Sequence, residues 1–358
     1  MHRRLLTTLP AGLLTAGLLA GCAGERPAPA AATSSAGCAT PATPAAADTS
    51  TPEGFLGWMA EHPDDVSLVL GEDTHLPDEQ RPLASARKVV HLAAWAAAVQ
   101  DGRLAADRTV PVGVWERWYL PGTDGGAHPA ALARLGIPTD GLRAADPATP
   151  VLLSDVVSAM VQESDNAAPD LLRELLGPDA LAATAADLGW EDAPTGTLLG
   201  DVLTLVDPDV TDPDQAAQDY ADDPAEATRV QALPLPDAAT QAAWAATTSA
   251  GSAAGLAALH RALSAGELPA ARDQLEWQVP PPGYAGLGFK GGSFLGVLTE
   301  AVALRTEDGD VTVGVLLVEG LTAEETTVAL TSGLPQQQVL LAAMTDPDAA
   351  AALDCVLG

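Results

Sequence analysis

Lysine is the residue that this sequence almost lacks. The 358-residue chain has two lysines, Lys88 and Lys290, against fifteen arginines. Arginine effectively cannot lose its proton in a protein, whereas a desolvated lysine can. The two exceptions therefore predict sites where a removable proton matters. The alternative is chance survival of two lysines under a bias toward Ala, Gly, Pro and Arg.

Basic charge and aromatic residues are also scarce. The formal net charge is −31 and the pI is near 4.2, which argues against nucleic-acid binding because phosphates need a basic surface. An anionic substrate would need a local positive patch in so acidic a protein. Aromatics make up 4 % and hydrophobic residues 47 % of the chain, so a sizeable core must consist mainly of Ala, Leu and Val.

Cysteine occurs three times, at Cys22, Cys38 and Cys355. The basic "MHRR" and the apolar "LLTTLPAGLLTAGLLAGC" that follows predict an export signal over 1–21. The end of this stretch, "LAGC", resembles a bacterial lipoprotein box, in which the cysteine is lipidated. We therefore expect an extracytoplasmic protein anchored through Cys22 to the outer face of the cell membrane. An ordinary cleaved signal and a retained membrane helix are the alternatives. Cys38 and Cys355 either pair as a disulfide or are unrelated thiols.

The remaining sequence predicts a tether and a discontinuous fold. Residues 22–52 are small and polar and cannot bury enough surface to fold. Helix and strand patterns fill 53–110 and 246–358, which predicts one α/β subdomain built from two separate segments. Residues 111–245 show helical patterns without convincing strands, which predicts an all-helical subdomain between them.

Ser85 and Lys88 lie three residues apart where a helix is expected to begin. This spacing places both side chains on one face of the helix. A serine hydroxyl is a poor nucleophile until a base removes its proton, and a neutral lysine amine one turn away can do this. The structural alternative is that Ser85 only caps the helix.

Two further polar groups accompany the lysines. "QESDNAAPDLL" places Ser164 and Asn166 at the junction of two predicted helices, where Ser164 can relay a proton; capping of the second helix is the alternative. "GFKGGSFLG" places Lys290 on a predicted strand, followed by Gly292 and Ser293. Glycines there let a substrate approach the backbone, whereas an edge-strand lysine that blocks aggregation is the alternative.

Taken together, Ser-x-x-Lys, Ser-Asp-Asn and Lys-Gly-Gly resemble the motif set of serine β-lactamases and penicillin-binding proteins, especially class A β-lactamases. The resemblance covers about 53 to 358. It implies an α/β (α+β) fold with an antiparallel sheet flanked by helices, plus an all-helical subdomain and a pocket between them. It also implies Ser85 as nucleophile, Lys88 as base and Ser164 as proton relay.

The same resemblance implies the substrate contacts. Asn166 would orient the substrate, and Lys290 with Ser293 would receive its anionic end beside Gly292. The amides of Ser85 and Ser293 would form an oxyanion hole. A β-lactam or a peptidoglycan peptide is the implied partner of a monomeric enzyme. No cofactor or metal is implied, because no His or Cys cluster has ligand spacing.

The sequence departs from the class A pattern at two places. The Glu-x-x-Leu-Asn motif that positions the deacylating water is absent, and Asp201 is the nearest carboxylate by position, although a helix cap or a solvated loop acid is the better interpretation of it. Gly291 replaces the usual threonine. Acylation of Ser85 is therefore better supported than hydrolysis of the acyl-enzyme. A D-Ala-D-Ala peptidase, an esterase, or a sensing lipoprotein that acylates without turnover are the alternatives to a β-lactamase.

Overall fold

A computed structural model of the chain describes residues 47–105 and 107–358. The predicted signal 1–21, the predicted lipidation site Cys22, and Cys38, with its predicted pairing to Cys355, lie outside these ranges. Of the predicted tether, 22–52, only the last residues are described. Thr49 is buried and its hydroxyl donates to Glu325 O at 2.9 Å. The packed fold therefore starts a few residues earlier than predicted, because Thr49 is buried and its hydroxyl is hydrogen-bonded to the Glu325 carbonyl.

The central element is a six-stranded antiparallel sheet with the order β2-β1-β10-β9-β7, in which β8 also pairs with β9. The Asp308-Gly309 pair predicts a hairpin turn, and β9 and β10 do turn there, with φ +91° at Gly309. The pattern of "YAGLGFKGGSFLG", residues 284–296, predicts a single strand, but the structure divides it into β7 and β8 at Lys290 and Gly291. The strands of this sheet are β1 Val66–Leu70, β2 Asp73–His75, β7 Tyr284–Phe289, β8 Gly292–Phe294, β9 Val297–Thr306 and β10 Val311–Val318.

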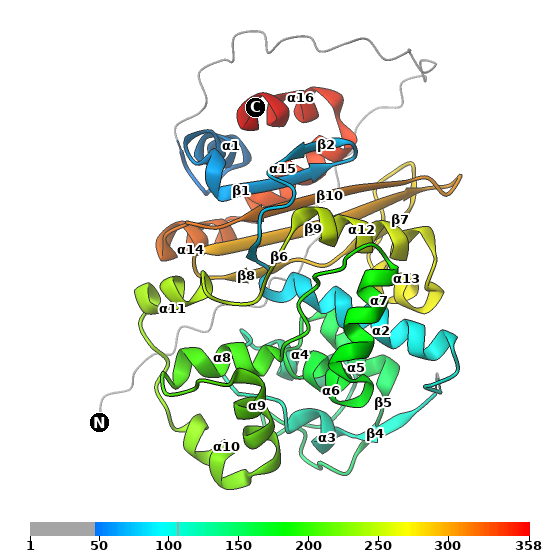
Figure 1. The fold of residues 1–358 in the computed structure, drawn as a ribbon, viewed down its shortest axis with the longest axis vertical. Coiled ribbons are helices and arrows are strands. Elements are labelled where there is room, and N and C mark those ends of the chain that lie inside the picture. Colours follow the sequence, from blue (N-terminus) through cyan, green and yellow to red (C-terminus); the bar gives the residue numbers. More distant parts are fainter. Residues whose placement is uncertain (1–46, 106) are drawn as a thin grey trace.

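Helices cover both faces of the sheet (Figure 1). On the outer face lie the first helix and the last helices of the chain. On the inner face α12 packs against β9 and β10, and the helical lobe lies beyond it. The outer layer consists of α1 Pro52–Glu61, α14 Ala323–Thr331, α15 Pro335–Thr345 and α16 Pro347–Leu357, and the inner layer of α12 Ala253–Ala265 and α13 Pro269–Leu275.

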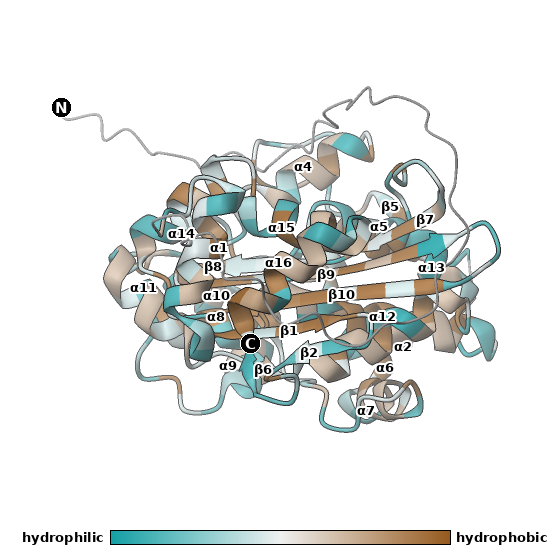
Figure 2. Ribbon diagram, turned by 90° about the horizontal axis from the view of Figure 1, so that it is seen from above, coloured by the Kyte–Doolittle hydropathy of each residue, from teal (hydrophilic) through white to brown (hydrophobic). Residues whose placement is uncertain are grey.

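Strand β9 supplies side chains to both cores because successive residues point to opposite faces. Leu298, Val302 and Leu304 pack in the outer core, whereas Ala301 and Ala303 belong to the inner core. Figure 2, seen from above, shows β9 and β10 as largely hydrophobic ribbons inside more hydrophilic surroundings. The sheet is thus buried on both faces, and this makes it a rigid platform for residues at its β7–β8 edge.

The helical lobe occupies the segment between the two parts of the sheet layer. It also contains one short strand pair, β4 Thr109–Pro111 with β5 Pro150–Leu152, so the segment from 111 to 245 is not wholly helical. A second small pair joins β3 Arg81–Pro82 to β6 Ala250–Gly251. The helices are α3 Val112–Glu116, α4 Ala127–Arg134, α5 Leu153–Gln162, α6 Ala167–Leu176, α7 Pro178–Asp187, α8 Leu198–Val206, α9 Pro213–Asp222, α10 Pro224–Gln231 and α11 Ala238–Ala245.

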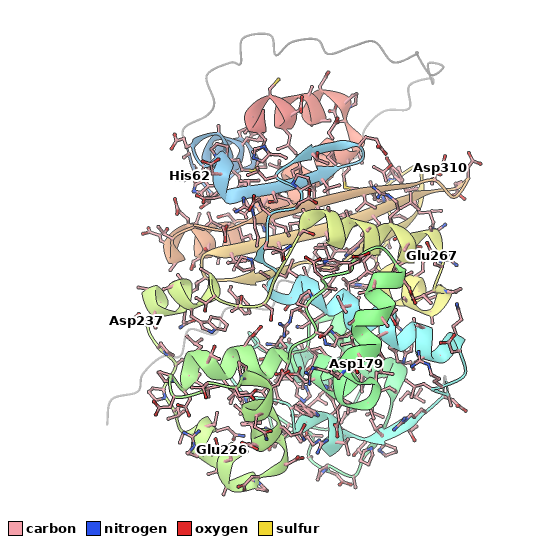
Figure 3. All side chains as sticks on the ribbon, viewed as in Figure 1. His62, Asp179, Glu226, Asp237, Glu267 and Asp310 are labelled. Carbon is pink, nitrogen blue, oxygen red and sulfur yellow. The ribbon has the colours of Figure 1, made fainter. Side chains whose placement is uncertain are left out.

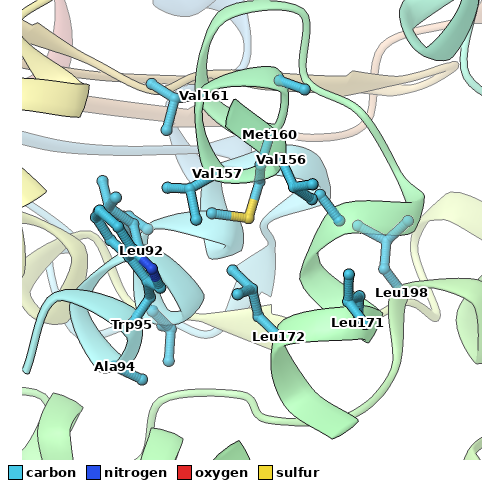
Figure 4. Close-up of a cluster of buried hydrophobic side chains, with 14 of the residues drawn as sticks. Leu92, Ala94, Trp95, Val156, Val157, Met160, Val161, Leu171, Leu172 and Leu198 are labelled. Atoms are coloured by element: carbon cyan, nitrogen blue, oxygen red, sulfur yellow. The ribbon is translucent and has the colours of Figure 1, made fainter. Parts of the chain in front are cut away.

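Helix α2, Lys88–Gln100, is the central helix of this lobe. Its lower half is apolar on every side except for His91, which predicts a buried helix, and the structure confirms this for nearly every residue, including His91. Figure 4 shows Leu92 and Trp95 facing side chains of α5 and Leu172 of α6. A helix enclosed in this way cannot shift without opening cavities on several sides, so its first residue is firmly positioned.

Charged side chains lie at the periphery. Figure 3 shows Asp179, Glu226 and Asp237 on the helical lobe and Asp310 at the tip of the β9–β10 hairpin. Within the described ranges, no helix combines the length and the apolar character that crossing a membrane requires.

Leu92→Ala tests the packing around α2. Leu92 is fully buried, and the cavity left by its side chain should lower the free energy of unfolding by about 3 kcal/mol. Urea denaturation measures this change. Leu142→Ala is the matched control, because Leu142 is 52 % exposed and its truncation should cost less than about 0.5 kcal/mol. Equal losses in both variants would contradict the central position of α2.

Candidate active site

Ser85 lies in a 3₁₀ turn, Ala84–Arg87, that leads directly into α2. Its side chain makes no capping hydrogen bond to a helix amide. Instead, Ser85 Oγ is 3.0 Å from Lys88 Nζ. Ala84, the residue before it, has φ +46°, a conformation that costs free energy for a residue with a Cβ. Ser85 therefore does not cap α2, and its hydroxyl lies beside the amine of Lys88.

The amine of Lys88 lies among four oxygen atoms. Besides Ser85 Oγ, Nζ lies 2.6 Å from Ser164 O, 2.7 Å from Asn166 Oδ1 and 3.1 Å from Ser164 Oγ. The two carbonyl oxygens can only accept, so they take two N–H bonds of the amine. A neutral amine then has one lone pair left, and the Ser85 hydroxyl can donate to it. The surroundings of Lys88 therefore suit the neutral form.

Electrostatics favours the same state of Lys88. Its side chain is 1 % exposed, and no ion pair joins it to a carboxylate among the described residues. Burial is the main cause that holds the pKa of Lys88 well below its usual range, and the positive charge of Lys290 is the second. An uncharged amine beside a serine hydroxyl is the arrangement that a general base requires.

Ser164 lies in the sharp turn between α5 and α6 with φ +64°. This left-handed conformation directs both its carbonyl and its hydroxyl to Lys88. Asp165 caps α6, because its Oδ1 accepts from Ala168 N at 2.7 Å and from Trp115 Nε1 at 2.9 Å. The capping role expected as the alternative for this motif thus falls to Asp165, and this leaves Ser164 and Asn166 to contact the amine.

A buried ionic network holds this turn. His128 Nδ1 lies 2.6 Å from Asp165 Oδ2, and His128 Nε2 lies 3.2 Å from Glu116 Oε1. Burial opposes a charge on His128, but the two carboxylates outweigh it and raise the pKa of His128 to about 9. The same imidazolium holds the pKa of Asp165 below its usual range in spite of burial. Nothing in the spacing of residues 116, 128 and 165 links them, so this network could not be predicted from the sequence.

Lys290 reaches the same turn from the sheet. Its Nζ lies 3.0 Å from Ser164 Oγ and 2.7 Å from Gly291 O. Ser164 Oγ therefore bridges the two lysines of the chain. Burial lowers the pKa of Lys290 to about 7, although Glu300 opposes the shift. Because Lys290 is 3 % exposed, the solvated edge lysine considered as the alternative is wrong.

Strand β8 lies against the 3₁₀ turn of Ser85. A Cβ on Gly292 would come within 2.3 Å of Ser85 N, so only glycine allows this approach. Thr299 Oγ1 donates to Leu83 O or Gly292 O, each at 3.1 Å, and links the turn to β8. Ser293, the next residue, is exposed. The space freed by Gly292 is therefore taken by the protein itself, and Ser293 is the residue of this strand that is open to a ligand.

Asp201 makes no hydrogen bond with Ser85, and both lie within the described residues. Its Oδ2 accepts from Arg87 Nη1 at 2.7 Å and from Ser249 N at 3.3 Å. Asp201 lies in the first turn of α8, where an acid is stabilised by the helix dipole. Its carboxylate thus forms an ion pair with a fully buried arginine, and Asp201 is neither the cap of α8 nor a solvated loop acid. The described residues contain no group of three or more His, Cys, Asp or Glu side chains that would hold a metal ion.

His128→Gln tests the network that holds Ser164. The pKa of His128 is raised from about 6.5 to about 9, so its stabilisation is complete below pH 6.5 and is lost as the pH rises through 9. At neutral pH the free energy of unfolding of His128→Gln should be about 3 kcal/mol below that of the wild type. This difference should disappear as the pH rises through 9, because the other titrating groups contribute equally to both proteins. Denaturation at a series of pH values checks both, and His62→Gln is the exposed control.

Comparison with known structures places this site in a known fold. A β-lactamase from Sphaerobacter thermophilus DSM 20745 aligns with a TM-score of 0.50 at 18 % identity, over 78 % of this chain and 93 % of that one. A β-lactamase from Chitinophaga pinensis DSM 2588 gives 0.47 at 14 %, over 80 % and 98 %. The class A β-lactamase of the last common ancestor of Gram-negative bacteria gives 0.48 at 16 %, over 79 % and 96 %. The first likeness confirms the predicted fold class.

Sequence comparison gives the family. No curated protein sequence matches the chain. The model of the β-lactamase enzyme family, however, matches residues 59–334. This range contains the Ser85, Ser164 and Lys290 segments and most of the chain, and on this ground the protein belongs to the β-lactamase enzyme family.

Proposed function

We propose that the protein is a serine hydrolase that opens β-lactams or related amides through an acyl-enzyme on Ser85. The observation that carries this proposal is the buried amine of Lys88. Its nitrogen lies 3.0 Å from Ser85 Oγ, and its N–H bonds are donated to the carbonyl oxygens of Ser164 and Asn166. The neutral amine has one lone pair left to accept a proton, and the hydroxyl of Ser85, at 3.0 Å, can supply it.

The acylation step follows from the contacts of this amine. Lys88 Nζ takes the Ser85 proton while Oγ forms a bond to the substrate carbonyl carbon. The C–N bond of the substrate then breaks, and the leaving nitrogen needs a proton. Ser164 Oγ, 3.1 Å from Lys88 Nζ, donates its own proton and regains one from Lys88. Lys88 is neutral again at the end, as the step requires.

The substrate would lie beside β8. Ser293 is the exposed side chain there, Gly292 brings the strand against the Ser85 amide, and the amides of Ser85 and Ser293 would bind the developing oxyanion. Asn166 Oδ1 orients the Lys88 amine, and its amide NH₂ is the group with which it would hold a substrate carbonyl. Lys290 would contribute by its hydrogen bond to the hydroxyl of Ser164, the proposed proton relay.

A second candidate function is a peptidase, an esterase or a sensor whose acyl-enzyme persists. The engagement of the Asp201 carboxylate by Arg87 and Ser249 favours it. Hydrolysis of an acyl-enzyme requires activation of a water molecule, and Asp201 is not free for this task. The lifetime of the adduct distinguishes the two candidates.

Intact-protein mass spectrometry with a chromogenic β-lactam tests the proposal. The wild type should gain the mass of the opened lactam on Ser85, and Ser85→Ala should gain nothing. Lys88→Met should slow acylation by about 100-fold or more, since a thioether cannot serve as general base. Arg103→Met, at an exposed site beyond the end of α2, is the matched control and should acylate normally.

The time course separates the candidates. Fast colour change without a trapped adduct identifies a β-lactamase, and a long-lived adduct on Ser85 identifies the sensor or peptidase. Acylation of folded Lys88→Met at the wild-type rate would contradict the role of the amine.

We also propose that the chain is a lipoprotein anchored through Cys22, on the support of the "LAGC" sequence. In a bacterial host, wild-type protein should incorporate radiolabelled palmitate and sediment with membranes. Cys22→Ala should lose the label and leave the membrane fraction, whereas Cys38→Ala should keep both. Membrane attachment of Cys22→Ala without label would instead indicate a retained signal helix.

A further inference from the structure

Glu300 is an acid in the middle of an otherwise apolar strand. It lies on β9, within "VLTEAVALRT", and only 5 % of it is exposed. By the alternation of β9 it points to the sheet face that carries Leu298 and Val302. No step of the proposed acylation uses this side chain, and a buried carboxylate is costly unless it has a compensating role.

Two amides from the start of α15 hold this carboxylate. Gln336 Nε2 donates to Oε1 at 3.0 Å and Gln337 Nε2 to Oε2 at 3.2 Å. Leu334, the residue at which the chain enters α15, has φ +60°. It shares this left-handed strain with Ala84 and Ser164 of the site. Strained residues persist where the surroundings fix them, and they concentrate at functional sites.

The carboxylate borders the substrate strand at Gly291. A Cβ on Gly291 would lie 3.1 Å from Glu300 Oε2 and 3.0 Å from the Phe289 ring. The carbonyl of the same glycine accepts from Lys290 Nζ at 2.7 Å. The Glu300 carboxylate and the Lys290 amine therefore both lie next to the main chain of Gly291. We call the segment 290–291 with Glu300 and Gln336 the Gly291 corner.

The Gly291 corner has more hydrogen-bond acceptors than donors. Glu300 makes no ion pair with any side chain of the described ranges, and Gln336 Oε1 is buried without a hydrogen-bond donor there. A substrate carboxylate bound beside this corner would add two more acceptors and a like charge. An amide, a hydroxyl or an uncharged ester would not add a charge, and the first two would supply a donor.

The charge of the corner also changes sign with pH. Burial raises the pKa of Glu300 to about 7, partly offset by the two glutamine amides and by Lys290. The pKa of Lys290 is about 7 as well. Below pH 7 the acid is neutral and the amine is charged, which gives +1. Above pH 7 the acid is charged and the amine neutral, which gives −1. Lys290 is the charged group that acts on Glu300, since α15 contributes only neutral amides.

We propose that Glu300 determines substrate specificity by making the Gly291 corner disfavour a carboxylate above neutral pH and accept an uncharged or hydrogen-bond-donating end. This inference rests on the proposed function and corrects one part of it. Lys290 and Ser293, expected from the sequence to receive an anionic end, then do so only at acidic pH.

The test compares one chromogenic cephalosporin as the free carboxylate and as its methyl ester. Acylation rate constants for both are measured by quenched-flow mass spectrometry at pH 6 and pH 8.5. In the wild type the carboxylate-to-ester ratio of rate constants should fall about tenfold from pH 6 to pH 8.5, the size of one like-charge interaction in a partly buried site. The ratio cancels any effect that acts equally on both probes through Lys88 or Ser164.

Glu300→Gln removes the charge and keeps the shape. At pH 8.5 it should raise the carboxylate-to-ester ratio about tenfold over the wild type. Glu307→Gln, at the exposed β9–β10 hairpin, removes the same charge from the molecule and should leave the ratio unchanged. A ratio within twofold of the wild type in Glu300→Gln, or equal slowing of both probes, overturns the inference while Ser85 labelling upholds the proposed function. Labelling by neither probe in the wild type overturns both.

Discussion

The uncharged amine of Lys88 is the constraint on which the site depends. A lysine that is 1 % exposed loses the hydration of its charged form, and no described carboxylate pairs with it. It is satisfied instead by the carbonyls of Ser164 and Asn166, which accept its protons without supplying a full negative charge. Because the two carbonyls take the N–H bonds, the remaining lone pair of the nitrogen faces the hydroxyl groups of Ser85 and Ser164. Removing either carbonyl would allow the amine to turn away from Ser85.

Holding this amine requires three segments far apart in sequence. The first turn of α2 carries Lys88, the α5–α6 turn carries Ser164, and the break between β7 and β8 carries Lys290. Each is backed by something that cannot easily move: the packed α2, the Asp165–His128 ion pair, and a sheet buried on both faces. The positive φ of Ser164 costs free energy locally, and the ionic network beneath it overcomes that cost. The stability of this region and the geometry of the site therefore depend on the same interactions.

The sequence predicted the parts of the site that are local or rare in composition. Ser85 and Lys88 share a helix turn, and the two lysines were singled out by their scarcity. The hairpin at Asp308-Gly309 and the buried α2 followed from turn residues and apolar patterning. What escaped prediction depends on contacts across long separations. His128 lies 37 residues from Asp165, and the two glutamines lie 36 and 37 residues from Glu300. An acid in an apolar strand was the one available signal for Glu300, and the sequence does not indicate what faces it.

The acidity of the molecule makes a neutral amine harder to keep, and the structure shows how this is resolved. Each nearby carboxylate would raise the pKa of Lys88 by attraction, as Asp165 and Asp124 do in part. Asp165, however, is balanced by His128, and Asp201 by Arg87. Many other acids lie at the periphery, where solvent and salt screen them. Glu300 is the exception, because no ion pair balances it among the described residues, and the one basic group that lowers its pKa is Lys290, which also contacts Ser164. A change in the charge of that one acid is therefore felt at both ends of the site: directly by the substrate beside Gly291, and through Lys290 by the hydroxyl of Ser164.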